Sequence, residues 1–216
     1  LVLHHRKVTE VGYRTMRQLL LDRGYEQGSQ PFIFYRDVAL ADGCIRVEVD
    51  LLGGEYGGTG ASHRTQKVHD INVRKARGAD LAFDSPVETT VSGTLPGGAK
   101  DSVTLRVASI VPFIVMKSMA LDSRLKEKDS WDIYFCIRNY PGGVEAVAEA
   151  FTPHLRHGLV REGLQHLAKH FGSVDGIGPT HVADFEMITD AEERNRIRRD
   201  VFERIHYLLE RTGSVP

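Results

Sequence analysis

Two acidic side chains, Glu48 and Asp50, fall two residues apart in a segment where apolar and charged residues alternate. In a strand, successive side chains point to opposite faces, so both carboxylates would share one face. Carboxylates this close repel each other, and Mg²⁺, which prefers carboxylate oxygens, would relieve that repulsion. We therefore treat Glu48 and Asp50 as candidate metal ligands. The alternative is an ordinary amphipathic strand whose polar face lies in water.

A group of cations forms the second candidate site. Lys117 follows the apolar run 112–116, where an ammonium group needs a partner or a ligand. If one helix continues through this region, Arg124 and Lys128 project within about 20° of Lys117. Such an edge can hold a triphosphate, because phosphoryl transfer depends on positioning and charge neutralisation. The alternative is a solvated charged face in which Lys128 pairs with Asp132, one turn away.

The elements that must position these groups fall into two parts. Residues 1–110 are expected to form a mixed-sheet core, and residues 111–216 a helical half, which makes the fold class α+β. Residues 1–3 are typical of the end of a strand. In the first part we predict a helix at 8–23 and strands at 31–39, 44–52 and 78–83, followed by a hairpin at 87–109. In the second part we predict helices at 112–125, 128–139, 143–152, 158–170 and 190–211.

Turn and cap residues refine these boundaries. Asp42-Gly43 predicts a hairpin turn with positive φ at both residues, and the segment 96–98, Pro-Gly-Gly, predicts the second turn. Thr189 and Glu192 predict a capping box for the last helix. The glycine-rich segment 53–60 lacks the Walker pattern and is interpreted as a connecting loop.

Composition limits the kind of protein. The 216 residues carry 28 Lys and Arg against 29 Asp and Glu, a net charge of -1, so a polyanion could only meet a local basic patch. The two cysteines form neither a disulfide framework nor a four-cysteine zinc site, and they favour a reducing, cytoplasmic setting. No apolar run is long enough to span a bilayer, so no membrane partner is expected.

The cationic segment resembles the later motif of the AbiEii/AbiGii-type nucleotidyltransferases. The matching residues are Lys117, Ala120, Arg124, Lys128, Asp129 and Asp132. They lead into an aromatic helix, whose apolar face we expect to carry Trp131, Tyr134 and Phe135. The segment 47–52 is similar to that family's later carboxylate strand. The resemblance implies a nucleotidyltransferase-like core, Mg²⁺, and transfer of a nucleoside monophosphate from a nucleoside triphosphate to an acceptor such as tRNA or a protein. Several members are toxins with a cognate antitoxin protein.

The resemblance also implies roles for individual residues. Asp50, with Glu48 as the competing choice, corresponds to a metal ligand or base, and Lys117 to the lysine near the phosphates. Asp129 corresponds to the acid that orients that lysine or the acceptor, while Arg124 and Lys128 support nucleotide binding. The family's earlier Asp-x-Asp motif is absent from this sequence. We therefore expect an N-terminally truncated chain that is inactive as given.

Two other interpretations remain open. A catalytically inactive transferase-fold module could bind a partner protein or nucleic acid, as the missing Asp-x-Asp suggests. A metal nuclease could use Glu48, Asp50 and Lys117. His166 and His170 lie one helical turn apart, but the glutamate that a zinc protease carries next to its first histidine is absent, so we interpret them as ordinary histidines.

Overall fold

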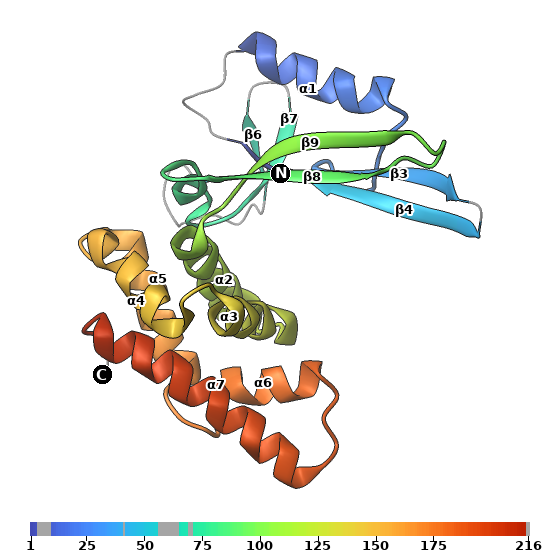
Figure 1. The fold of residues 1–216 in the computed structure, drawn as a ribbon. Coiled ribbons are helices and arrows are strands. Elements are labelled where there is room, and N and C mark those ends of the chain that lie inside the picture. Colours follow the sequence, from blue (N-terminus) through green and yellow to red (C-terminus); the bar gives the residue numbers. More distant parts are fainter. Residues whose placement is uncertain (4–9, 41, 56–64, 69–70, 215–216) are drawn as a thin grey trace. The chain divides into compact units, whose positions relative to one another are not determined.

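The computed structural model describes residues 1–3, 10–40, 42–55, 65–68 and 71–214. These residues form two compact units, Leu1–Ala108 and Ser109–Pro216 (Figure 1). The first unit holds the strands in small mixed sheets, and the second unit is helical. The fold class is therefore α+β with a helical C-terminal half, as the sequence predicted.

Among its described residues, the first unit contains one helix, one short 3-10 helix and three small sheets. The elements are β1 (Val2–Leu3), α1 (Glu10–Asp22), β2 (Glu26–Gln27), β3 (Ile33–Leu40), β4 (Gly43–Asp50), β5 (Leu52–Gly53), β6 (Thr65–Val68), β7 (Ile71–Lys75), η1 (Ala79–Phe83), β8 (Val87–Thr94) and β9 (Lys100–Val107). The sheets have the strand orders β1-β5-β7-β6, β2-β3-β4 and β8-β9. In the first sheet, β1, β5 and β7 run parallel, while β6 pairs with β7 in the antiparallel direction.

The first residues of the chain belong to a strand, as predicted. Val2 and Leu3 pair with Leu52 and Gly53, and Leu3 is buried in the core of this unit. Helix α1 supplies part of the same core through Met16, Leu20 and Leu21, whereas Leu19 is exposed. The buried core residues are Leu3, Phe32, Phe34, Leu51, Val68, Ile71 and Val73.

The β3–β4 hairpin has the predicted strands but a different turn. Leu40 pairs with Gly43, so Gly43 (φ 145°) lies in the strand and the turn comes one residue earlier than predicted. Asp50 ends β4, and Glu48 lies on the same face of the strand, opposite Tyr35. The sequence therefore placed both acids correctly on one face.

The region between the two hairpins differs from the prediction. The expected strand at 78–83 is wrong, because Ala79–Phe83 forms the 3-10 helix η1 after Gly78 in the left-handed region (φ 80°). The strands are β6 and β7 instead. Of the glycine-rich segment 53–60, only residues 53–55 are described. Gly54 lies so close to the Asp80 carboxylate that a Cβ atom would overlap it, so a larger residue here would displace that side chain.

The β8–β9 hairpin is amphipathic, and every residue of both strands is exposed. On one face the cross-strand pairs are polar: Glu88 with Arg106, Thr90 with Thr104, and Ser92 with Ser102. The other face carries Val87, Val91, Val103, Leu105 and Val107, each 43–51% exposed. This apolar face contributes little to the core of the unit.

Because that face is exposed, Val91→Thr and Val103→Thr should each change the free energy of unfolding by no more than about 0.5 kcal/mol. Both positions keep a β-branched side chain that suits a strand. Equilibrium denaturation with urea measures the effect, with the buried Val73→Thr as the positive control. A loss above about 1.5 kcal/mol in either hairpin variant would mean that the face is covered in solution.

The second unit consists of six α-helices and one 3-10 turn. They are α2 (Ile110–Arg124), α3 (Glu127–Asn139), α4 (Gly143–Phe151), η2 (Thr152–His154), α5 (Gly158–Phe171), α6 (Ile177–Phe185) and α7 (Ala191–Arg211). Helix α2 packs on α5, α3 packs on α6, and α7 runs beside α6 (Figure 1). The largest fully buried side chains of this unit are Tyr134, Phe151, Phe171, Ile114, Leu121, Ile133, Ile137 and Leu164.

Three details of this unit correct the sequence prediction. Helix α6 occupies part of the predicted loop 171–189. Helix α7 is capped by Asp190, whose carboxylate accepts a hydrogen bond from the Glu193 N–H at 2.8 Å, so the predicted cap at Thr189 is one residue too early. Phe135, predicted on the apolar face of α3, is 47% exposed. No helix in the described part of the chain is both long and apolar enough to cross a membrane.

Candidate functional site

The corner between α2 and α3 brings the cations and acids of the predicted motif together. Helix α2 ends at Arg124 because Leu125 adopts the left-handed conformation (φ 49°), with its N–H bonded to the Leu121 carbonyl. Helix α3 begins at Glu127. The continuous helix that we assumed for Lys117, Arg124 and Lys128 is therefore wrong.

Asp129 is the centre of this corner, and its side chain is 1% exposed. Arg124 donates two hydrogen bonds of 2.7 Å to Asp129, one from Nε to Oδ2 and one from a terminal nitrogen to Oδ1. Lys117 donates to Oδ1 at 3.1 Å. Charge-assisted, bidentate bonds of this kind fix the planar guanidinium and the ammonium in place.

Asp132 completes the arrangement one turn further along α3. Its Oδ2 accepts from Lys117 at 2.5 Å, and its Oδ1 accepts from Lys128 at 2.6 Å. Lys117 therefore bridges the two acids, and three cations face two carboxylates. We call Lys117, Arg124, Lys128, Asp129 and Asp132 the α2–α3 ion cluster.

Charge is retained at the centre of the cluster. Burial raises the pKa of the Asp129 carboxyl, but the hydrogen bonds from Arg124 and Lys117 outweigh burial, so its pKa lies below the ordinary value. The same bond to Asp129 raises the pKa of Arg124. Asp129 is thus ionised at neutral pH.

The cations keep hydrogen-bonding capacity for a further anion. Lysine has three N–H donors and arginine five, so the bonds to Asp129 and Asp132 leave some donors unused on each cation. The Lys128 side chain is 61% exposed, that of Arg124 39%, and that of Lys117 24%. An anion can therefore reach Lys128 and Arg124 most easily, with Lys117 deeper.

Asp50 is the candidate metal ligand in the first unit. Its Oδ2 forms an ion pair with Arg74 of β7. Its backbone carbonyl accepts a hydrogen bond of 2.7 Å from the Leu1 ammonium. Its Oδ1 is buried and has no hydrogen-bond partner among the described residues. A buried, unpaired carboxylate oxygen is costly, and a hard divalent cation would satisfy it.

Glu48 contributes less to such a site. The Glu48 side chain is exposed, whereas the Asp50 side chain is only 22% exposed. The two acids share a strand face but differ in their exposure to water. Among the residues that the structure describes, no group of three or more His, Cys, Asp or Glu side chains is arranged to hold a metal ion. One carboxylate still fits Mg²⁺, which is often held by one or two carboxylates together with substrate phosphates.

Arg74 was not recognised from the sequence, because no element was predicted for the segment that contains it. Its ring contact with Phe32, 5.5 Å from the guanidinium carbon to the ring centroid, helps to hold it beside Asp50. The signal that could have found it is the short run Ile71–Lys75, in which Arg74 follows the buried Val73 and precedes the strand end. Its pairing with Asp50 connects strands that lie far apart in the chain.

A second charged cluster lies between α2 and α5. Asp122 Oδ1 accepts from Lys169 at 2.7 Å and from the buried His170 at 2.8 Å, and His166 lies at 3.4 Å. The bonds from Lys169 and His170 lower the pKa of the Asp122 carboxyl to about 2. The two histidines of α5 thus have a structural role in joining two helices.

This cluster predicts a pH-dependent contribution to stability. Asp122→Asn should lower the free energy of unfolding at pH 7 by about 1–2 kcal/mol, allowing for partial exposure of the carboxylate. A depressed pKa stabilises the fold above the ordinary carboxyl pKa, so the difference from wild type should disappear as the pH falls from about 4 towards 2. Urea denaturation at several pH values measures it. Glu149→Gln, which removes an exposed acid of α4, is the matched control; a pH-independent difference would contradict the assignment.

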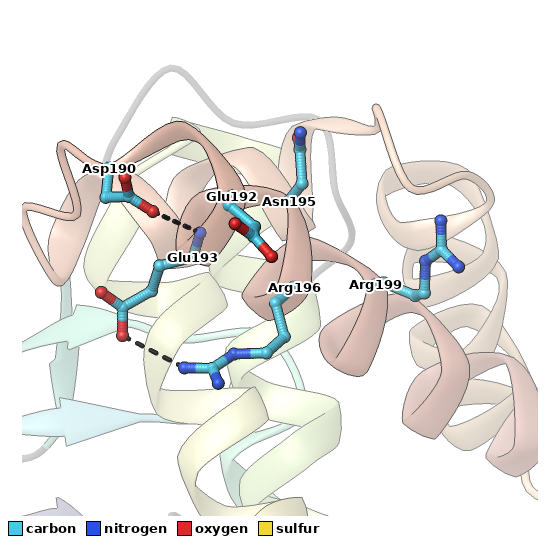
Figure 2. A pocket seen from close by; sticks show the side chains of 6 residues that line it. All are labelled: Asp190, Glu192, Glu193, Asn195, Arg196 and Arg199. Carbon is cyan, nitrogen blue, oxygen red and sulfur yellow. Dashed lines mark hydrogen bonds and ion pairs between the residues drawn. The ribbon is translucent and has the colours of Figure 1, made fainter.

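The hollow at the start of α7 is a separate feature (Figure 2). It is lined by Asp190, Glu192, Glu193, Asn195, Arg196 and Arg199. Within it Asp190 caps the helix and Arg196 pairs with Glu193 at 3.3 Å (Figure 2). Both interactions stabilise the helix itself, and none of the residues that line the hollow belongs to the ion cluster.

The arginines of α7 are also largely engaged with acids. Arg194 pairs with Asp184, and Arg198 pairs with Asp175. This pairing favours a structural role for the basic side of the helix.

Comparisons of the chain with models of protein families, with curated proteins and with solved structures find no match.

Proposed function

We propose that the protein is a Mg²⁺-dependent nucleotidyltransferase with a nucleotidyltransferase-like core, which moves a nucleoside monophosphate from a nucleoside triphosphate to an acceptor. The observation that carries the proposal is the α2–α3 ion cluster, in which the buried Asp129 holds Lys117 and Arg124 with unused donors. Transfer of a phosphoryl group is catalysed mainly by positioning and by neutralising charge, and fixed cations serve both.

Lys117 and Arg124 would bind the phosphates, and Lys128 would assist from the exposed side. Asp129 is a positioning residue, since it is fully buried and acts through the two cations that it binds. Asp132 orients Lys117 and Lys128 in the same way. Because the cations are held before the substrate arrives, less reorganisation is needed during transfer.

Asp50 is the residue that would hold Mg²⁺, through its buried and unpaired Oδ1. Bound Mg²⁺ would supply neutralisation of negative charge on phosphate oxygens. Arg74 fixes the other carboxylate oxygen of Asp50, and Glu48 is the competing acid on the same strand face.

The reaction balances as a substitution at the α-phosphorus. The acceptor oxygen forms a bond to that phosphorus, and the bond from it to the bridging oxygen breaks, so pyrophosphate leaves. The acceptor proton passes to a carboxylate or to water. A tRNA or protein acceptor and an antitoxin partner follow from the family resemblance and form part of the same proposal, together with the cytoplasmic setting that the two cysteines favour.

Label transfer tests the proposal most directly. The protein is incubated with Mg²⁺, each of the four nucleoside triphosphates labelled at the α-phosphate, and RNA or protein acceptors. We expect label in one acceptor class and release of pyrophosphate, both abolished by chelation of the metal. If no nucleotide supports transfer and calorimetry detects no nucleotide binding, the proposal is overturned and the inactive binding module is favoured.

A further inference from the structure

An exposed aromatic surface lies on α3 next to the ion cluster. The rings of Trp131 and Phe135 stack with centroids 4.8 Å apart and an interplanar angle of 26°. Phe185 of α6 contacts the Trp131 ring from another position, with centroids 5.1 Å apart. Phe135 itself is 47% exposed, so this surface is open to a ligand.

The orientation of Trp131 is fixed. Its indole N–H donates to the Glu186 carboxylate at 3.0 Å, and its ring contacts the rings of Phe135 and Phe185. Because the fixed indole stacks on Phe135, the exposed side of the Phe135 ring offers a flat apolar surface at little entropic cost.

A cation borders the aromatic surface. The Lys128 ammonium lies 5.8 Å from the centroid of the Trp131 ring and also bonds to Asp132 of the ion cluster. The order along α3 is therefore cation, indole and exposed phenyl ring, at positions 128, 131 and 135. With a rise of 1.5 Å per residue, Phe135 lies about 10 Å along the helix from Lys128.

We infer that the exposed Phe135 ring, supported by Trp131, forms a stacking platform for the base of the nucleotide whose phosphates meet Lys128 and Arg124. A nucleotide is flat and aromatic at one end and anionic at the other, which matches the order of chemistry along α3. Stacking on aromatic side chains tolerates every base, because each base has a π-face. The inference rests on the proposed function and names the residues that hold the base.

The platform can be tested with its own tryptophan, since Trp131 is the only tryptophan in the chain. Each nucleoside triphosphate is titrated into the 216-residue chain while indole emission is recorded with excitation where bases do not absorb. Inorganic tripolyphosphate, which has the charge and no base, is the matched probe. We expect saturable quenching by nucleotides and none by tripolyphosphate.

Variants of the exposed ring provide the second arm. Phe135→Ala should weaken nucleotide binding about tenfold or more by calorimetry and leave tripolyphosphate binding unchanged, whereas Phe135→Tyr should retain nucleotide affinity. Ile177→Ala, at a similarly exposed apolar residue of α6, is the control and should bind as wild type. Equal nucleotide affinity in Phe135→Ala and wild type, or equal quenching by tripolyphosphate, would overturn the platform.

The outcomes separate the platform from the transferase proposal. Label transfer with unchanged binding in Phe135→Ala would refute the platform and leave the transferase intact. Saturable, base-dependent quenching without label transfer would support the platform and refute transfer. Quenching of Trp131 by an added protein, but by no nucleotide, would refute the platform and identify the surface as a protein interface.

Discussion

Asp129→Ala is expected to lower the free energy of unfolding of the helical unit by about 3 kcal/mol, the largest stability effect of any single substitution in the ion cluster. The carboxylate is 1% exposed, and its removal leaves Arg124 without its two bonds and Lys117 with one of its two acids. The loss is smaller than for a fully buried pair, because Arg124 is 39% exposed and can turn towards water. Urea denaturation followed by helical circular dichroism measures it.

Two comparisons isolate the role of the buried charge. Glu127→Ala removes an exposed acid from the first turn of the same helix and should cost no more than about 1 kcal/mol. Asp129→Asn keeps part of the hydrogen bonding while removing the charge, so its loss should be intermediate. Equal losses in Glu127→Ala and Asp129→Ala would show that the cluster adds nothing beyond a favourable charge near the helix start.

Much of the fold was predictable where local chemistry determines it. Gly24, with φ 76°, follows α1 as a helix-ending glycine, and the turn around residues 96–98 joins β8 to β9 as predicted. The alternation of apolar and charged residues in β4 placed Glu48 and Asp50 on one face. These features depend on neighbours within a few residues, so a sequence pattern can reveal them.

The failures arise where two local signals conflict. Gly176, Gly178 and Pro179 suggested a loop, yet α6 begins at Ile177 with Pro179 in its first turn, where no backbone N–H is required. Gly178 also packs against the Phe171 ring, where a Cβ atom would overlap it, so this glycine serves packing rather than a turn. The short apolar run 79–83 was compatible with a strand or a helix, and periodicity alone does not separate them.

The candidate site was predictable in its members but not in its bonds. Seven residues separate Lys117 from Arg124, which places both on one side of α2. Asp129 can bind both cations because the chain turns at Leu125, which adopts the left-handed conformation. Non-glycine residues rarely adopt this conformation, and no local sequence pattern predicts it here. Likewise, the pairing of Asp50 with Arg74 depends on sheet topology. Long-range contacts of this kind are fixed by the fold rather than by spacing.

Asp50→Asn should abolish label transfer in the proposed enzyme, because a neutral amide oxygen binds Mg²⁺ poorly compared with a carboxylate. The variant keeps the size of the side chain and an acceptor for Arg74, so the first unit should remain folded. Glu48→Gln is the matched control on the same strand face and should retain transfer if Asp50 is the ligand. Loss of label transfer in Glu48→Gln, with transfer retained in Asp50→Asn, would instead identify Glu48 as the metal ligand.

Lys117→Ala is expected to reduce kcat/KM for transfer by at least about 10²-fold, the magnitude typical of losing one fixed group that stabilises transition-state charge. The fold should survive, because Arg124 still holds Asp129 and Lys128 still holds Asp132. Lys126→Ala, an exposed lysine between the same helices, should retain wild-type rates. Wild-type rates in Lys117→Ala would remove this lysine from the chemistry.

The distribution of the loss between kcat and KM identifies what Lys117 does. Two carboxylates hold its ammonium, at 3.1 and 2.5 Å, so it cannot follow a loosely bound phosphate as a free lysine would. A cation fixed in this way should act on charge that develops during transfer, which lowers kcat with little change in KM. The more exposed Lys128 should show the opposite distribution, because it can meet the ground-state triphosphate equally well. A rise in KM alone for Lys117→Ala would instead assign it to substrate binding.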